Sequence, residues 1–264
     1  MIVLILLTFL LGLTYVWLLN KYALLWSSIN NYTKLEEKVH VSLVIPFRNE
    51  ENHLTKLVAS LNELDLSNIR LDVIWIDDHS TDDSVSVVEN GVFKHPSTVL
   101  KLEESTGKKS AIKLAWKNVK ADIIVQTDAD CVLPTNWLQK VLAPFNNEGV
   151  EVVSAPVKFT DNSTFWHKLV ALDFAGLIGI GAAHIAWQNV LIANGANLAY
   201  RKSTIKSLDL NERRASGDDV FLVQSIGLNN PAAIKFVKHN DATVLTEGPA
   251  SFTEFWNQRL RWAG

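Results

Sequence analysis

The chain has 264 residues, of which 48% are hydrophobic and 20% charged, and 25 Lys and Arg against 28 Asp and Glu give a formal net charge of −3. This composition is that of a folding chain and excludes long disordered or low-complexity sequence. Non-specific nucleic-acid binding needs a basic excess that this chain lacks, so no nucleic-acid partner is expected. The one cysteine, Cys131, cannot form an intrachain disulfide.

An uncharged apolar run opens the chain, because residues 1–19 contain no Asp, Glu, Lys or Arg. A helix of this length is about 28 Å long, which matches the hydrocarbon core of a bilayer. No basic residue precedes the run, and it ends in Trp17 and two leucines rather than in small residues. An uncleaved anchor is therefore favoured over a cleaved signal peptide. A buried core helix is the alternative.

The residues that follow the run indicate its orientation. Basic residues lie on its C-terminal side: Lys21, Lys34, Lys38 and Arg48. The positive-inside rule then places the rest of the chain in the cytoplasm. We predict a transmembrane anchor over residues 1–26, in an inner or plasma membrane with the lipid bilayer as a partner, followed by a polar linker over residues 27–40.

Short β-rich runs alternate with helical patterns after the linker. Strands are predicted over residues 41–46, 71–76, 98–102 and 122–127. Apolar residues at helical spacing predict helices in the intervals and after Pro134, marked by Leu54, Leu57 and Leu61, by Ala111, Ile112 and Ala115, and by Trp137, Val141 and Phe145. This alternation predicts βαβ units with a mostly parallel sheet, so residues 41–264 fit one α/β domain.

Acidic residues follow two of these strands. Asp77 and Asp78 end the second strand and can accept hydrogen bonds from a ligand, although Asp is also an ordinary helix cap. Asp128 and Asp130 follow the fourth strand, and their alternate spacing lets both approach one hard cation, with a polyphosphate supplying further oxygens. A turn with solvated carboxylates is the alternative. Because ligands of open α/β sheets bind at the carboxyl ends of the strands, the site is expected at this edge.

Two further segments carry weaker signals. Gly107, Lys108 and Lys109 precede a helix expected to start at Ser110, and a flexible glycine, ammonium groups and free helix N–H donors together favour a phosphate. A solvated lysine pair is the commoner meaning of such a doublet. Asp219 lies at another helix start, where it is either a cap or a base for a hydroxyl proton.

The C-terminal segment has the form of a capping box from Ser251 to Glu254, which predicts a helix beginning there. Gln258, Arg261 and Trp262 fall at i, i+3 and i+4 and therefore share one face of that helix. A guanidinium and an indole on one face suit a phosphate and a sugar ring. An amphipathic helix at the membrane interface is the alternative, and both interpretations are compatible.

The segment 165–188 is long and apolar, but Lys168, Asp173 and His184 within it argue against a membrane span. We expect it to pack beside the ligand cleft or to touch the bilayer surface. His184 is expected to be a structural histidine with satisfied hydrogen bonds rather than a metal ligand.

Seven motifs occur in order along the chain: IPFRNEE (45–51), DDHSTDDS (77–84), GKKSAIKLA (107–115), TDAD (127–130), NGANLAYRK (194–202), GDD (217–219) and QRLRW (258–262). Together they resemble the ordered motifs of membrane-bound family-2 glycosyltransferases. The last is similar to the QxxRW signature of synthases that make cellulose, chitin, hyaluronan or poly-N-acetylglucosamine. The similarity covers nearly everything after residue 40.

The resemblance implies a GT-A fold, with a mostly parallel Rossmann-like sheet and flanking helices, and an inverting transfer that uses Mg²⁺ or Mn²⁺. It implies a nucleotide-diphosphate sugar donor, UDP-linked, and a glycan or lipid-linked acceptor. The donor site that it implies consists of Pro46, Phe47, Glu50, Asp77, Asp78, Lys108 and Asp128. Asp130, together with Asp128, would hold the metal, and Asp219 would be the catalytic base. Gln258, Arg261 and Trp262 would contact the diphosphate and position the acceptor.

Two departures from the family pattern stand out. Asp218-Asp219 replaces the more familiar Glu-Asp at the base. The chain also stops at Gly264, whereas processive relatives continue into further transmembrane helices, so a domain truncated at its C-terminal end is expected.

Two other functions stay open from the residues alone. A phosphohydrolase of the haloacid dehalogenase type also places a DxD after a hydrophobic strand, but it normally opens its domain with that motif, and it does not account for QRLRW. A non-catalytic membrane-tethered nucleotide-sugar binder is the other, and it is favoured if Asp219 lies far from Asp130.

Overall fold

The computed structural model describes residues 1–103, 107–160, 163–207 and 218–263. A central sheet has the strand order β3-β2-β1-β4-β7-β5-β8, and β6 and β9 form a second, parallel pair. The strands are β1 (Val39–Phe47), β2 (Ile69–Asp77), β3 (Ser97–Lys101), β4 (Ile123–Gln126), β5 (Val152–Ser154), β6 (Val157–Phe159), β7 (Leu198–Arg201), β8 (Ile234–Phe236) and β9 (Val244–Thr246). The predicted α/β class is confirmed.

Parallel pairing joins β3, β2, β1 and β4, whereas β7 runs antiparallel to both β4 and β5. The four strands predicted from the sequence are these parallel ones, and each predicted boundary lies within two residues of the observed one. Their carboxyl ends therefore meet at one edge of the sheet, as expected from the pattern.

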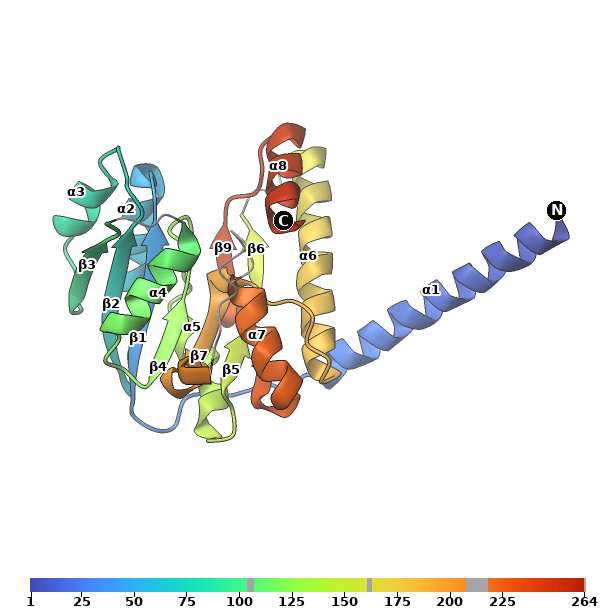
Figure 1. Cartoon of the computed structure of the whole chain (residues 1–264), viewed down its shortest axis with the longest axis horizontal. Coiled ribbons are helices and arrows are strands. Elements are labelled where there is room, and N and C mark those ends of the chain that lie inside the picture. Colours follow the sequence, from blue (N-terminus) through green and yellow to red (C-terminus); the bar gives the residue numbers. More distant parts are fainter. Residues whose placement is uncertain (104–106, 161–162, 208–217, 264) are drawn as a thin grey trace.

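Helices cover the sheet on both sides. They are α2 (Glu51–Asn62), α3 (Ser84–Glu89), α4 (Lys108–Asn118), α5 (Trp137–Leu142), α6 (Phe165–Ala186), α7 (Asp218–Asn229) and α8 (Phe252–Ala263). Successive residues of β1 enter opposite cores, since Leu43 and Ile45 pack with Leu57 of α2 while Val44 packs with Ile112 of α4. Figure 1 shows α4 and α7 on one face of the sheet, and α6 and α8 side by side beyond β6 and β9.

The first helix, α1 (Ile2–Ser28), has no buried residue and extends away from the rest of the protein (Figure 1). Among the described residues, α1 and α6 are the two helices long and apolar enough to cross a membrane. Tyr22 of α1 shares a hydrogen bond of 3.0 Å with His184 Nε2 of α6, and His184 Nδ1 lies 3.0 Å from the carbonyl of Asn189. His184 is therefore the satisfied structural histidine that was expected.

The segment after α1 is packed rather than loose. Leu35 is fully buried in the core. Lys140 Nζ donates to the Thr33 carbonyl at 2.7 Å, and Asn146 Nδ2 donates to the Lys34 carbonyl at 3.0 Å. Within the predicted linker, residues 27–40, Ile29 and Leu35 are thus buried, and two carbonyl groups accept hydrogen bonds from Lys140 of α5 and from Asn146.

Candidate active site

An acidic pair lies at the carboxyl end of β4. Asp128 is about one-third exposed, and its Oδ1 lies 2.5 Å from Lys108 Nζ in the first turn of α4. Gly107 precedes that turn with φ 94°, a left-handed conformation that glycine adopts readily, and its N–H donates to Asp78 Oδ2 at 2.8 Å. The start of α4 thus contacts the ends of both β2 and β4, and it places Lys108 beside the acidic pair.

Asp130 is the more buried member of the pair. Burial raises its pKa above the ordinary aspartate value, and the charge of Asp128 raises it further. A hydrogen bond of 2.8 Å from Thr246 Oγ1, at the end of β9, acts in the opposite direction. A buried carboxylate beside a second carboxylate is costly unless a cation or hydrogen bonds compensate.

Glu50 begins a chain of charged groups beside this pair. Burial raises the Glu50 pKa, and Asp130 and Asp128 add to the increase against the hydrogen bond from His53. His53 Nδ1 lies 2.7 Å from Glu50 Oε2, and His53 Nε2 lies 3.5 Å from Glu247 Oε2. The chain joins the start of α2 to the residue that follows β9.

The face of α8 that carries Gln258, Arg261 and Trp262 points toward the same region. Ser251 Oγ accepts from the Glu254 N–H at 3.2 Å, so the predicted capping bond is present. Arg259 forms an ion pair with Asp173 of α6, and its guanidinium lies 4.5 Å from the Trp262 ring centroid. The ion pair holds α8 against α6, whereas the contact between the guanidinium and the indole lies within α8.

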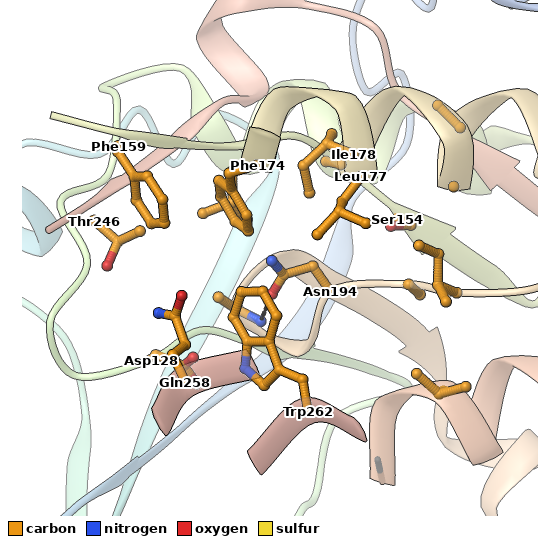
Figure 2. Close-up of a pocket in the computed structure, with 18 of the residues that line it drawn as sticks. Asp128, Ser154, Phe159, Phe174, Leu177, Ile178, Asn194, Thr246, Gln258 and Trp262 are labelled. Atoms are coloured by element: carbon orange, nitrogen blue, oxygen red, sulfur yellow. Dashed lines mark hydrogen bonds between the residues drawn. The ribbon is translucent and has the colours of Figure 1, made fainter. Parts of the chain in front are cut away.

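One cavity of about 380 Å³ collects most of these groups. Its polar lining includes Lys108, Asp128, Asp130, Thr246, Glu247, Gln258, Arg261 and Asn194. Figure 2 shows side chains from strand ends, α6 and α8 directed into this one space. Gln258 lines this cavity, and its Oε1 is buried without a hydrogen-bond partner among the described residues.

The other residues predicted to bind the sugar donor lie outside the lining of this cavity. Asp77 is buried and its Oδ1 accepts from the Ser80 N–H at 2.9 Å. The Phe47 side chain packs edge-on to Trp75 in the core, and Pro46 precedes it in β1. With Asp78 and Glu50 they form the carboxyl edge of β1 and β2, next to the acidic pair rather than inside the cavity.

The loops at this edge are tied together. Asn49 and His79 both have positive φ, at 56° and 62°. The Asn49 N–H donates to Ser80 Oγ at 3.1 Å, and Asn49 Oδ1 accepts from the Thr81 N–H at 2.8 Å. Non-glycine residues in this conformation are often found where a loop shapes a ligand site.

The predicted base is described only in its backbone. Asp219 lies in the first turn of α7, as the expectation of a helix start requires, and its neighbour Val220 lines the cavity. The side chains of Asp218 and Asp219, and all of Gly217, lie outside the described part of the structure.

A divalent cation fits the acidic pair through its donor chemistry. Carboxylate oxygens are the ligands that Mg²⁺ and Mn²⁺ prefer, and a positive ion would relieve the repulsion that raises the Asp130 pKa. Within the described ranges no group of three or more His, Cys, Asp or Glu side chains could hold a metal alone. An ion here would therefore take further ligands from a bound phosphate or from water.

Several site residues were missed from the sequence. Thr246, Glu247 and His53 carry no motif, and β9, which positions the first two, is a three-residue strand. Phe174, Leu177, Ile178, Gly181 and Ala182 of α6 also line the cavity, and their spacing could not identify them because apolar residues surround the whole helix. In the NGANLAYRK motif, Asn194 lines the cavity, whereas Asn197 is buried and accepts from Trp137 Nε1 at 3.0 Å.

Comparison with known proteins agrees with the fold and the motifs. The model of "Glycosyl transferase family 2" matches residues 42–209, which is more than half of the chain. The chain therefore belongs to glycosyl transferase family 2, and it has the GT-A fold. The phosphohydrolase alternative is wrong, since family membership excludes it.

The chain is similar to relatives that are longer than itself. It is 25% identical over 175 residues to a dolichol-phosphate mannosyltransferase of Pyrococcus furiosus, covering 65% of this chain and 49% of that protein. It is 21% identical over 225 residues to a poly-beta-1,6-N-acetyl-D-glucosamine synthase of Staphylococcus epidermidis, covering 84% and 53%. The chain thus spans about half the length of these curated relatives.

A solved structure shares the fold across almost the whole chain. It is a mannosyltransferase from Pyrobaculum calidifontis in complex with GDP-Man and Mn²⁺. The TM-score is 0.71 at 20% identity, with 93% of this chain and 68% of that chain covered.

Proposed function

We propose that this protein is a membrane-anchored inverting glycosyltransferase that moves a sugar from a nucleotide-diphosphate sugar, UDP-linked, to a lipid-linked or glycan acceptor. The observation that carries the proposal is one cavity that combines Asp128, Asp130 and Lys108 at the sheet edge with Gln258 and Arg261 of α8. The family assignment supports the reaction class, and the relatives' names include both a lipid-phosphate and a polysaccharide product.

The donor would extend from the strand ends into this cavity. Pro46, Phe47, Glu50, Asp77 and Asp78 form the edge of β1 and β2 and would border the base and ribose. Lys108 and Arg261 would bind the diphosphate, since both are cations at the cavity wall. Gln258 would donate and accept hydrogen bonds beside it, and Trp262 would present its ring to the acceptor.

The acidic pair would hold the metal, with Asp130 as the principal ligand and Asp128 beside it. A bound Mg²⁺ or Mn²⁺ supplies positive charge to the departing diphosphate. Lys108, which pairs with Asp128 in this structure, has a flexible side chain and would bind a phosphate oxygen of the donor.

Asp219 would act as the base. An acceptor hydroxyl attacks the anomeric carbon from the face opposite the diphosphate, and Asp219 takes the hydroxyl proton. A single displacement inverts the anomeric configuration.

Membrane attachment would come from α1, with residues 1–26 as the anchor and the catalytic domain, residues 41–264, in the cytoplasm. The absence of buried residues along α1 within the described structure supports this role. Lys21 Nζ lies 3.2 Å from the Trp187 ring centroid, so the cationic end of the anchor contacts the end of α6. On the outer side of α6, Phe165, Leu169 and Leu172 are exposed and would rest on the bilayer surface.

The test uses the full chain purified in detergent with Mn²⁺ and a panel of UDP- and GDP-sugars, and it measures nucleotide release. Asp219→Asn is compared with Asp122→Asn, whose exposed carboxyl lies at the opposite, amino-terminal end of β4. We expect release from one class of donor, loss of release in Asp219→Asn, and full release in Asp122→Asn. Equal release by Asp219→Asn would remove the assigned base. Donor binding without any release, even when lipid and glycan acceptors are added, would instead support the non-catalytic binder.

A further inference from the structure

The cavity is polar at one end and apolar over much of the rest. Its polar end holds Asp128, Asp130 and Lys108. Along α6 the lining changes to Phe174, Leu177, Ile178, Gly181 and Ala182. No side chain of that stripe carries a hydrogen-bond donor or acceptor.

This wall is poorly suited to a sugar chain. Each buried hydroxyl that loses water without a new hydrogen bond costs about 1 to 3 kcal/mol. The aromatic rings of the wall also pack on each other, because Phe174 stacks on Phe159 at 4.3 Å between centroids and lies 5.9 Å from Trp262. A hydrocarbon chain, by contrast, gains from every apolar contact there.

The apolar end of the cavity reaches the base of α1, which is the C-terminal end of this helix, residues 22–28. Phe236 of β8 lines the cavity, and its ring lies 6.1 Å from the ring of Trp26 in α1. The apolar wall of α6 continues directly into His184, which binds Tyr22 of α1. A second hollow of about 140 Å³, lined by Ile29, Ile185 and Phe236 among others, lies at the same junction.

Small residues form the most closely packed part of this wall. Gly181 packs so closely on Ile192 that a Cβ added at Gly181 would lie 3.2 Å from Ile192 atoms. Ala182 beside it is fully buried, and both residues line the cavity with Ile192. The inner stripe of α6 therefore forms a narrow apolar surface between the acidic pair and the anchor.

We propose that the acceptor is a membrane lipid, whose hydroxyl group lies at the polar end while its hydrocarbon chain lies along the inner stripe of α6 toward the base of α1. This inference rests on the proposed function. In the transfer, the lipid oxygen forms a bond to the anomeric carbon, and the bond from that carbon to the diphosphate breaks. The electron pair leaves on the diphosphate, and the hydroxyl proton passes to Asp219.

The experiment places the full chain in lipid nanodiscs that contain a diacylglycerol with a photoactivatable diazirine in one acyl chain. After illumination, mass spectrometry locates the crosslinked residues. We expect crosslinks at Ile178 and Ile192, inside the cavity, in addition to those on α1. Leu177→Gln places an amide on the inner stripe and is expected to lower the interior crosslinking roughly tenfold. Leu228→Gln, on a residue that is 86% exposed on α7, is the matched control and should change nothing.

Two further readouts separate the possible failures. The circular dichroism spectrum of Leu177→Gln should match that of the unmodified chain, which shows that the variant is folded. With a radiolabelled donor, the transferred sugar should partition into butanol with the lipid.

Donor binding and nucleotide release, with crosslinks confined to α1 and the outer face of α6, would overturn the lipid acceptor and leave the proposed function intact. Label found only on an added water-soluble oligosaccharide would do the same. Absence of nucleotide release with every donor and lipid would remove the proposed function and this inference with it.

Discussion

Removal of the Thr246 hydroxyl tests what sets the pKa of Asp130 and its affinity for Mn²⁺. Thr246 Oγ1 donates to Asp130 Oδ2 at 2.8 Å, and this bond opposes the increase in the Asp130 pKa that burial and Asp128 produce. Thr246→Val keeps the shape of the side chain and removes the donor. A hydrogen bond to a charged group contributes about 1.5 to 3 kcal/mol, so the affinity for Mn²⁺ should fall about 10- to 100-fold, the range found when outer-shell partners of metal ligands are removed.

The sign of the pH effect follows from the same bond. Without Thr246 Oγ1 the pKa of Asp130 rises further, so the carboxylate that binds the cation is lost at a higher pH. The acidic limb of nucleotide release, measured at fixed Mn²⁺, should therefore move to higher pH in Thr246→Val and should return in Thr246→Ser. An unchanged Mn²⁺ dependence together with an unchanged pH profile would show that Asp130 does not bind the metal.

Three further predictions follow from contacts around the site. Phe174→Ala removes a buried ring stacked on Phe159 and should lower the free energy of unfolding by about 3 kcal/mol in urea titrations; a loss under about 1 kcal/mol would contradict the packing. Lys108→Gln removes the cation beside Asp128 and should weaken donor binding about tenfold in calorimetry, with equal binding as the contrary result. Burial lowers the pKa of His53, but the neighbouring glutamates raise the pKa overall, so the stabilisation from the charged imidazole is lost as pH rises above about 6.5. The thermal unfolding midpoint should therefore fall over this pH range, and the fall should be smaller in His53→Gln.

The parallel half of the sheet could be predicted because its strands are long enough to show a pattern. β1 and β2 have nine residues each, and apolar runs in β1, β2 and β4 end directly at polar or acidic residues. The acidic pair followed from the same logic, since Asp128 and Asp130 come immediately after the last of these strands. Local sequence was enough there because the chemistry lies where the strands end.

The rest of the central sheet and the separate pair of β6 and β9 could not be predicted. β5, β6, β8 and β9 have three residues each, which is too short for periodicity to separate strand from loop. Their pairing joins segments far apart in the chain, as in the register of Phe159 with Thr246. The bond from Thr246 to Asp130 depends on this pairing, so no local signal could reveal it.

The helix α6 illustrates a different limit. Its apolar residues surround the whole helix, so composition alone could not separate a membrane span from a helix packed at the protein surface. The charged residues within it indicated a helix packed at the protein surface. The structure shows why both sides are apolar, since Leu177 and Ile178 line the cavity whereas Phe165 and Leu172 face outward.

The most direct test of the central claim is a crystal structure of the chain with Mn²⁺ and UDP, with the metal located by its anomalous signal. We predict an anomalous peak within coordination distance of Asp130 and a diphosphate in contact with Lys108 and Arg261. The uracil ring should lie at the ends of β1 and β2. A nucleotide bound with its diphosphate outside the cavity, or a manganese ion bound away from Asp128 and Asp130, would contradict the account.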